Sequence, residues 1–193
     1  MVKQDRARRT HALVLDAAAA EFAAHGFAAT NLQLVAARTG LTKGALYGHF
    51  ASKAELAAEL TRQFEEHWRH LLDAAATGAG SPLRALHTLV TELTRRTQQD
   101  VRFTAGLRLV CEEAQSQGAA AVQLEALREL LLRLVVRAQQ DGEIAADHAP
   151  AVLSQLLLTL VYGLPHTPSA GEDARPPGEM WQILLPAMRR STA

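Results

Sequence analysis

The sequence predicts an all-α protein, and three observations support that prediction. Hydrophobic residues make up 48% of the 193 residues, with Ala and Leu dominant, and only 5% of the residues are aromatic. Runs of β-branched residues are short, whereas apolar residues recur at helical spacing between glycine and proline breaks. The chain is long enough to form one medium domain, or two small domains that share a core.

The first quarter of the chain has the pattern of three short helices, which we expect over residues 9–25, 32–39 and 43–50. Gly26 ends the first helix and Gly40 the second, because glycine readily adopts the left-handed conformation that follows many helices. Thr42 caps the third helix. Either Thr30 or Asn31 caps the second helix, and the sequence leaves this choice open.

The remaining residues predict six more helices, at about 52–76, 82–100, 101–117, 120–141, 148–164 and 177–190, so that about nine are expected in all. Ser52 caps the first of these, with Glu55 at its third position. The segment from Gly163 to Gly178 holds four of the seven prolines and is expected to be a loop. The helix over 148–164 is nearly apolar on all sides, which fits either a dimer interface or a buried central helix.

Three residues, Ala36, Gly40 and Leu46, have the spacing of a helix-turn-helix. Ala36 permits close approach of the two helices, Gly40 supplies the turn and Leu46 anchors the second helix on the first. The same spacing fits an ordinary corner between two helices. The charge distribution favours DNA binding, since residues 1–53 carry seven Lys/Arg against three Asp/Glu, and the remaining residues carry 13 against 17.

Several classes of site are absent from the sequence pattern. A single cysteine, Cys111, excludes an intrachain disulfide and a cysteine-based zinc site. His67 and His70 have metal-ligand spacing but no third ligand, so we expect no metal and no cofactor. No phosphate loop or nucleophile elbow is present, which argues against an enzyme with catalytic residues. No signal peptide is evident and the longest apolar run is too short for a bilayer, which predicts a cytoplasmic protein without membrane contact.

Residues 9–56 resemble the N-terminal domain of the TetR family of one-component repressors. The resemblance is carried by Phe22, Gly26, Thr30, Val35, Ala36, Gly40, the run 42–47, His49, Phe50, Lys53 and Leu56. It implies a homodimer whose two third helices enter successive major grooves of an inverted-repeat operator. The DNA-binding residues that it implies are Thr30, Thr42, Lys43, Gly44, Ala45, Tyr47, Gly48, His49 and Lys53. Phe50 is assigned to the core.

Two details of this region leave alternatives. Gly48 departs from the family pattern, which usually has a bulky or aromatic residue there, and a glycine lowers helix propensity by ~1 kcal/mol relative to alanine. Arg6, Arg8 and Arg9 are either a solvated tail or an arm that grips phosphate or the minor groove.

The body of the chain resembles a TetR subgroup, the γ-butyrolactone autoregulator receptors, in the runs 105–109 and 180–184. Those receptors place a tryptophan before an Arg-Glu pair, where this chain has Leu127. The effector implied is a small apolar molecule, either a butyrolactone-like signal or an antibiotic. The candidate effector-binding residues are Phe64, Trp68, His87, Phe103, Leu107, Val110, Cys111, Leu127 and Tyr162. For each of them, plain core packing is the competing interpretation.

The resulting prediction is a transcriptional repressor with two domains. Residues 1–53 form the helix-turn-helix DNA-binding domain, and residues 54–193 form a helical domain for ligand binding and dimerisation through the helices over 148–164 and 177–190. The effector would favour a geometry in which the two recognition helices no longer match the operator. The alternative hypothesis is a protein that sequesters a small molecule or binds a partner without binding an operator.

Overall fold

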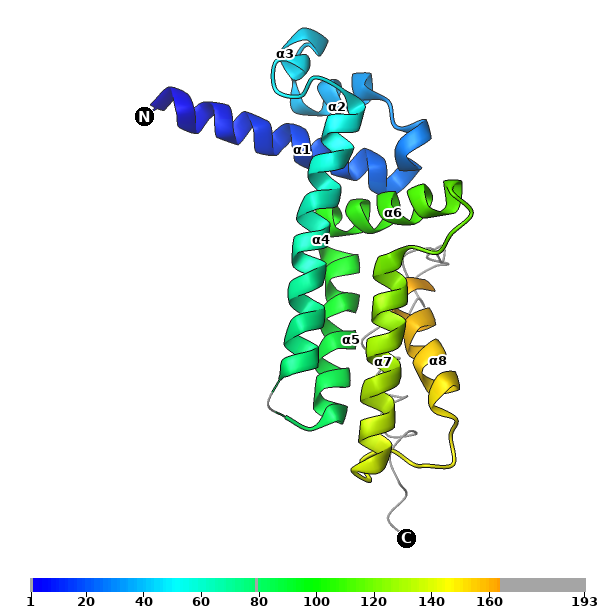
Figure 1. Cartoon of the computed structure of the whole chain (residues 1–193). Coiled ribbons are helices and arrows are strands. Elements are labelled where there is room, and N and C mark those ends of the chain that lie inside the picture. The colour runs from blue at the N-terminus through cyan, green and yellow to red at the C-terminus, as the bar shows by residue number, and fades with distance from the viewer. Residues whose placement is uncertain (1, 79, 164–193) are drawn as a thin grey trace, which may run out of the picture. The chain divides into compact units, whose positions relative to one another are not determined.

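The structure, a computed structural model, describes residues 2–78 and 80–163, and within them it contains eight helices and no strand, so that the all-α prediction is confirmed. The helices are α1 (Val2–Ala29), α2 (Leu32–Thr39), α3 (Lys43–Tyr47), α4 (Lys53–Thr77), α5 (Pro82–Gln99), α6 (Val101–Ser116), α7 (Val122–Gln140) and α8 (Pro150–Gly163) (Figure 1). The expected loop over 163–178 and helix over 177–190 lie outside the described residues.

The chain forms two compact units. The first contains residues 1–67 and 100–121, and therefore α1 to α3, the first part of α4, and α6. The second contains the described parts of 68–99 and 122–193, which supply the rest of α4 together with α5, α7 and α8. The predicted division into a DNA-binding domain (1–53) and a domain for ligand binding and dimerisation (54–193) is a division by function, and it stays a prediction.

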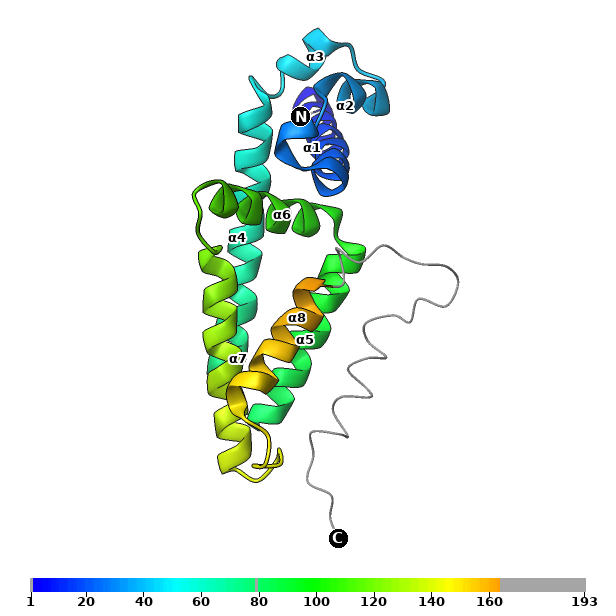
Figure 2. The same ribbon diagram turned by 90° about the vertical axis from the view of Figure 1, so that its right-hand side faces the viewer.

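One continuous hydrophobic core holds the first unit together. It is built by Val14, Leu15, Ala18, Ala19, Phe22, Val35, Ala36, Leu46, Phe50, Leu56, Ala57, Leu60, Ala105 and Leu109. These residues come from α1, α2, α3, α4 and α6, with Phe50 following α3, and Figure 2 shows α1 and α6 side by side. Burial of apolar surface from five helices stabilises each of them against the others.

Two arginines of α6 stabilise the packing of this helix against α1. Arg102 Nε donates to Asp16 Oδ1 over 2.6 Å, and its guanidinium also reaches the carbonyl of Ala12. Arg108 donates to the carbonyl of Ala23 over 2.9 Å. Because these guanidinium groups bind carbonyl oxygens on the backbone of α1, they fix the position of α6 along that helix.

Most of the predicted helix ends are confirmed. Gly40 adopts the left-handed conformation (φ 67°), and Thr42 caps α3 by accepting from the amide of Ala45. Ser52 caps α4 by accepting from the amide of Glu55 over 3.1 Å. Asn31, and not Thr30, caps α2, because its side-chain oxygen accepts from the amide of Gln33 over 2.8 Å.

Two predicted boundaries were wrong. The first helix begins at Val2 and not at residue 9. Gly26 interrupts it as predicted, because its φ of 75° and ψ of −180° are not helical, and a further helical stretch follows to Ala29. The third helix ends at Tyr47 and not at residue 50, although the amide of Phe50 still donates to the carbonyl of Leu46. The burial of Phe50 draws the chain toward the core and ends the regular helix early.

The length and hydropathy of residues 5–29 would also allow this helix to cross a membrane. Its buried residues belong to the core of the first unit, and the helix of a protein core has the same composition.

Gly106 brings α6 into close contact with α4. A Cβ atom at this position would lie 2.3 Å from Cβ of Phe64 and 3.0 Å from the carbonyl oxygen of Leu60. Phe64 in turn packs edge-on against Phe103, with ring centroids 5.0 Å apart. The absence of a side chain at Gly106 is therefore a condition of this packing.

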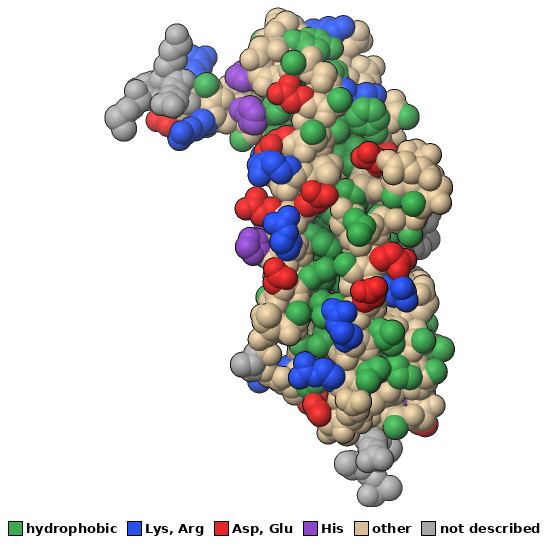
Figure 3. Space-filling view, in the orientation of Figure 1, with side chains coloured by type: hydrophobic (Ala, Val, Ile, Leu, Met, Phe, Trp, Pro, Cys, Tyr) green, Lys and Arg blue, Asp and Glu red, His purple; other side chains and the backbone are tan. Residues whose placement is uncertain are grey.

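The second unit has a buried face on each of its helices and an exposed apolar strip on α8. Leu153, Leu157 and Leu160 are buried, whereas Val152 and Leu156 are 58% and 51% exposed. Figure 3 shows hydrophobic side chains on the surface around α7 and α8. The prediction that α8 belongs to a dimer interface is compatible with this strip and stays a prediction.

We expect Gly106→Ala to lower the free energy of unfolding by about 1–3 kcal/mol, because the added methyl group overlaps the backbone of α4 and Phe64. Urea unfolding measures the change. Gly44→Ala is the matched control, since a Cβ atom there meets nothing within 4 Å. Equal stability of the Gly106→Ala variant and the wild type would contradict the close contact.

A second prediction concerns Glu92 on α5, which accepts two hydrogen bonds from Arg95 (2.7 and 2.8 Å) and one from Arg96 (2.8 Å). The hydrogen bond from Arg95, followed by that from Arg96, lowers the pKa of Glu92 from 4.5 to about 2. Since the folded-state pKa lies below the unfolded value, this stabilisation is present above about pH 4.5 and is lost as the pH falls toward 2.

Glu92→Gln should therefore lower the free energy of unfolding at pH 7 by about 1 kcal/mol. This figure is smaller than the pKa shift alone would give, because Glu92 is partly exposed and solvent screens its ion pairs. The difference between variant and wild type should shrink as the pH is lowered from 5 to 3. A difference that stays constant over this range would show that the ion pairs of Glu92 do not stabilise the fold.

Candidate nucleic-acid interface

Helices α2 and α3 form a helix-turn-helix whose outer surface is polar. Ala36 and Leu46 are buried between the two helices and α1, with Leu46 fully inaccessible to solvent. The residues before and after Leu46 are exposed, and all of those that follow were predicted to bind DNA: Thr42, Lys43, Gly44, Ala45, Tyr47 and Gly48. A core residue thus anchors α3, and the residues around it are left free for a partner.

Lys43 and Tyr47 are the largest exposed side chains of α3. They are four residues apart, and the ammonium of Lys43 lies 5.9 Å from the centroid of the Tyr47 ring. Tyr47 is the last residue of this five-residue helix, and it is 42% exposed. Figure 3 shows Lys and Arg side chains on the surface around α2 and α3. A cation beside a phenol hydroxyl suits a surface that contacts phosphates and base edges.

An open cleft of about 470 Å³ joins α3 to the beginnings of α2 and α4. It is lined by Thr30, Asn31, Leu32, Gln33, Lys43, Tyr47, Ala51, Ser52 and Lys53. The first backbone amides of a helix have no hydrogen-bond partner within the helix and carry the positive end of its dipole. Because α2 and α4 both begin at this cleft, the cleft favours binding of an anion such as a phosphate. The sequence indicates Asn31 and Ser52 only as capping residues and offers no other signal for them.

Lys53 also has partners within the protein. Its ammonium donates to the carbonyls of Phe27 (2.8 Å), Ala28 (3.2 Å) and Thr30 (3.2 Å), and lies 4.8 Å from the centroid of the Phe27 ring. These carbonyls belong to the end of α1 and the residue after it. Lys53 therefore connects α4 to α1. Its positively charged ammonium donates hydrogen bonds to carbonyl oxygens that have no partner within the helix at the end of α1.

Three other predicted positions differ in their surroundings. Thr30 is buried, and its hydroxyl donates to the carbonyl of Gly26 over 2.6 Å. His49 is partly buried after the end of α3. Gly48 has φ of −73°, a conformation open to other residues, although a Cβ atom would lie 3.3 Å from the carbonyl oxygen of Ala45. Of the predicted DNA-binding residues, Thr30, Lys43, Tyr47 and Lys53 line the cleft together.

A buried carboxylate that the sequence analysis did not single out fastens α2 to α1. Glu21 is 1% exposed, and its Oε1 lies 2.8 Å from the guanidinium of Arg38 on α2. His25 Nε2 lies 3.9 Å from the other carboxylate oxygen. Removal of Arg38 would leave the buried carboxylate of Glu21 without its counter-charge, which strongly destabilises a fold. This ion pair therefore helps to hold α2 of the helix-turn-helix against α1.

Arg6, Arg8 and Arg9 belong to the regular part of α1 and are exposed. They lie on a helix and are solvated in this structure, so that the choice between a solvated segment and an arm that grips DNA stays open. A role of these arginines in gripping DNA stays a prediction.

The candidate effector-binding residues are divided between the two units. Phe64, Phe103, Leu107, Val110 and Cys111 are buried in the first unit, each at most 8% exposed. In the second unit Trp68 and Leu127 are buried and His87 is partly buried. The side chain of Tyr162 lies outside the described residues.

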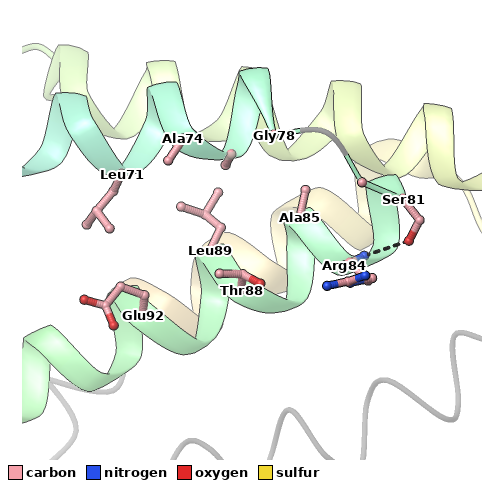
Figure 4. Close-up of a pocket in the computed structure, with 11 residues that line it drawn as sticks. Leu71, Ala74, Gly78, Ser81, Arg84, Ala85, Thr88, Leu89 and Glu92 are labelled. Atoms are coloured by element: carbon pink, nitrogen blue, oxygen red, sulfur yellow. Dashed lines mark hydrogen bonds between the residues drawn. The ribbon is translucent and has the colours of Figure 1, made fainter.

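A small cavity in the second unit involves none of these residues. It has a volume of about 230 Å³ and lies between the end of α4 and the beginning of α5. Figure 4 shows Leu71, Ala74 and Leu89 toward one another across it, with Arg84 and Glu92 at its margin. Pockets for small ligands are usually larger than this.

No group of three His, Cys, Asp or Glu residues that could hold a metal ion occurs in residues 2–78 and 80–163.

Comparison with known proteins agrees with this geometry. Residues 14–60 match the model of the family described as bacterial regulatory proteins, tetR family. The HTH-type transcriptional regulator AcrR of Shigella flexneri is 29% identical over 153 residues, which cover 78% of this chain and 71% of that protein.

Two solved structures are similar over nearly the whole chain. The TetR family protein CprB from Streptomyces coelicolor, solved in complex with its operator sequence, is 30% identical, with a TM-score of 0.73 and coverage of 97% of this chain and 92% of that one. A γ-butyrolactone receptor described as ArpA-like is 28% identical, with a TM-score of 0.72 and the same coverage. The chain therefore belongs to the TetR family and, like its relatives, is a DNA-binding transcriptional regulator.

Proposed function

We propose that the chain binds inverted-repeat operator DNA as a homodimer, with α3 of each copy in a major groove, and that a small apolar effector releases it. The observation that carries the proposal is the placement of Lys43 and Tyr47. Both are exposed on a helix that Leu46 anchors, and both line a cleft at which α2 and α4 begin. Such a protein acts where the DNA is, in the cytoplasm.

Within this proposal, α3 supplies the contacts to bases and the cleft supplies those to phosphates. Gly44 and Ala45 are small and exposed, which allows the backbone of α3 to approach the groove floor. Lys43 extends from the first turn toward base edges or a phosphate, and the Tyr47 hydroxyl is suited to a phosphate. The beginnings of α2 and α4 then hold phosphates beside the groove.

A homodimer on an inverted repeat follows from symmetry, because two copies related by a two-fold axis present α3 to two half-sites. The solved complex of CprB with its operator supports operator binding for this chain by similarity. The exposed apolar strip of Val152 and Leu156 on α8 supports a role for this helix in dimer formation.

The effector part of the proposal is supported by the similarity to a γ-butyrolactone receptor and by the hydrophobic character of the candidate residues. Release requires only that the effector bind better to a conformation with a different spacing of the two α3 helices. Most of the candidate effector-binding residues are buried against their neighbours. An effector that contacts them therefore has to separate these packed side chains when it binds. A butyrolactone-like signal and an antibiotic both have the required apolar surface.

We expect Lys43→Ala to weaken binding to the operator by about 1–3 kcal/mol per half-site, because the variant loses a cationic contact in the groove. Fluorescence anisotropy with DNA fragments from upstream of the gene measures the change. Arg69→Ala is the matched control, since Arg69 is exposed on α4 and lines neither the cleft nor the small cavity. If both variants bind as tightly as the wild type, α3 does not read the operator.

Lys53 provides a separate prediction, because it has carbonyl partners within the protein. Lys53→Ala should lower the free energy of unfolding by about 1 kcal/mol and also weaken operator binding, since the carbonyls at the end of α1 lose their cation. Chemical unfolding and anisotropy are compared on the same preparations. Weaker operator binding with unchanged stability would show that Lys53 serves only as a phosphate contact.

A further inference from the structure

Gln33, the second residue of α2, lines the same cleft as the exposed residues of α3. It shares this cleft with Lys43 and Tyr47. The backbone amide of Gln33 donates to the side chain of Asn31, which caps α2. The side chain of Gln33 is exposed and makes no hydrogen bond within residues 2–78 and 80–163. Its amide group is therefore available to a partner.

Most other polar side chains of the cleft already have partners within the protein. Thr30 donates to the carbonyl of Gly26, and Lys53 donates to three carbonyls around the end of α1. The side-chain oxygens of Asn31 and Ser52 accept from backbone amides at the beginnings of α2 and α4. Among the described residues that line the cleft, three polar side chains remain for hydrogen bonds with a partner: Gln33, Lys43 and Tyr47.

A DNA segment that contacts α3 would also be within reach of Gln33. Helices α2 and α3 are neighbours in the helix-turn-helix, as Figures 1 and 2 both show, and the cleft joins them. Val35 and Ala36 are buried in the core, which fixes the direction in which the other residues of α2 leave the helix. Gln33 is thus presented on the surface that also carries the exposed residues of α3.

The donor and the acceptor of a glutamine amide suit a base better than a phosphate. A phosphate offers only acceptors, so it would leave the carbonyl oxygen of Gln33 without a donor. The major-groove edge of adenine offers the acceptor N7 beside the N6 amino donor, and these two groups match the NH₂ group and the carbonyl oxygen of the amide. Lys43 and the two helix beginnings already supply positive charge for phosphates.

We propose that Gln33 is a specificity-determining residue, which binds the major-groove edge of one adenine in each half-site of the operator. This inference rests on the proposed function, in which α3 lies in the major groove of an inverted repeat. It adds a base contact from α2 to the contacts that α3 makes. No residue of α2 is among the DNA-binding residues that the resemblance to the TetR family implies.

The test begins with selection of bound sequences from a pool of random duplex DNA, by the full chain and by its Gln33→Ala variant. We expect the wild type to enrich an inverted repeat with adenine at a symmetry-related pair of positions. Gln33→Ala should enrich the same repeat but accept any base at that pair. Gln115→Ala, at an exposed glutamine of α6 outside the cleft, is the matched control and should keep the preference for adenine.

A base analogue in the selected duplex identifies the contact. In 7-deazaadenine a C–H group replaces N7, so this analogue at the adenine pair should weaken binding of the wild type about tenfold per half-site. It should leave the affinity of Gln33→Ala unchanged. Fluorescence anisotropy measures both affinities.

Gln33→Glu gives a test with a gain of preference. The glutamate has the same length but presents only acceptors at pH 7, so the preference at this pair should move from adenine to cytosine, whose N4 amino group donates. A residue with a merely structural role would not exchange one preferred base for another at a single pair of positions.

Three outcomes would overturn the inference while the proposed function stands. If Gln33→Ala selects the same bases as the wild type at every position, Gln33 reads no base. If the variant binds all sequences more weakly by the same factor, Gln33 contacts a phosphate. If preferences relax at many positions, Gln33 acts by holding α3. Failure of the wild type to enrich any inverted repeat would instead refute the proposed function, and this inference with it.

Discussion

The burial of Leu46 is the contact on which the functional surface depends. A helix of five residues such as α3 is too short to be stable alone, because helix formation requires a costly first turn. Its position is set by Leu46 in the core, by the cap at Thr42 and by Phe50, which is buried just beyond the helix. The exposure of Lys43 and Tyr47 is a consequence of this anchoring, since the other sides of α3 remain in solvent.

A second set of contacts joins the end of α1 to its neighbours. Lys53 binds three carbonyls there, Glu112 accepts from the amide of Phe27, and Arg38 meets the buried Glu21. Each contact pairs a charged side chain with a group that would otherwise lack a partner. The helix-turn-helix is therefore connected to α4 and α6 by charge-assisted contacts in addition to apolar packing.

The sequence predicted the features that depend on neighbouring residues. The turn at Gly40 and the caps at Thr42 and Ser52 involve groups within a few positions, so their patterns are visible along the chain. Lys53 was recognised as important, but its partners lie 23 to 26 residues away and appear only in the folded chain. The ion pair of Glu21 with Arg38 was missed for the same reason. The roles of individual residues in binding DNA or an effector rest on similarity and stay predictions.

The central claim, that α3 lies in the major groove of an inverted repeat, is tested most directly by methylation interference on the upstream DNA. Methylation of guanine N7 modifies the major groove, whereas methylation of adenine N3 modifies the minor groove. The account predicts that N7 methylation blocks binding at two symmetry-related positions about one helical turn, or a multiple of it, apart. Interference confined to adenine N3, or bound DNA that tolerates N7 methylation at every position, would contradict it.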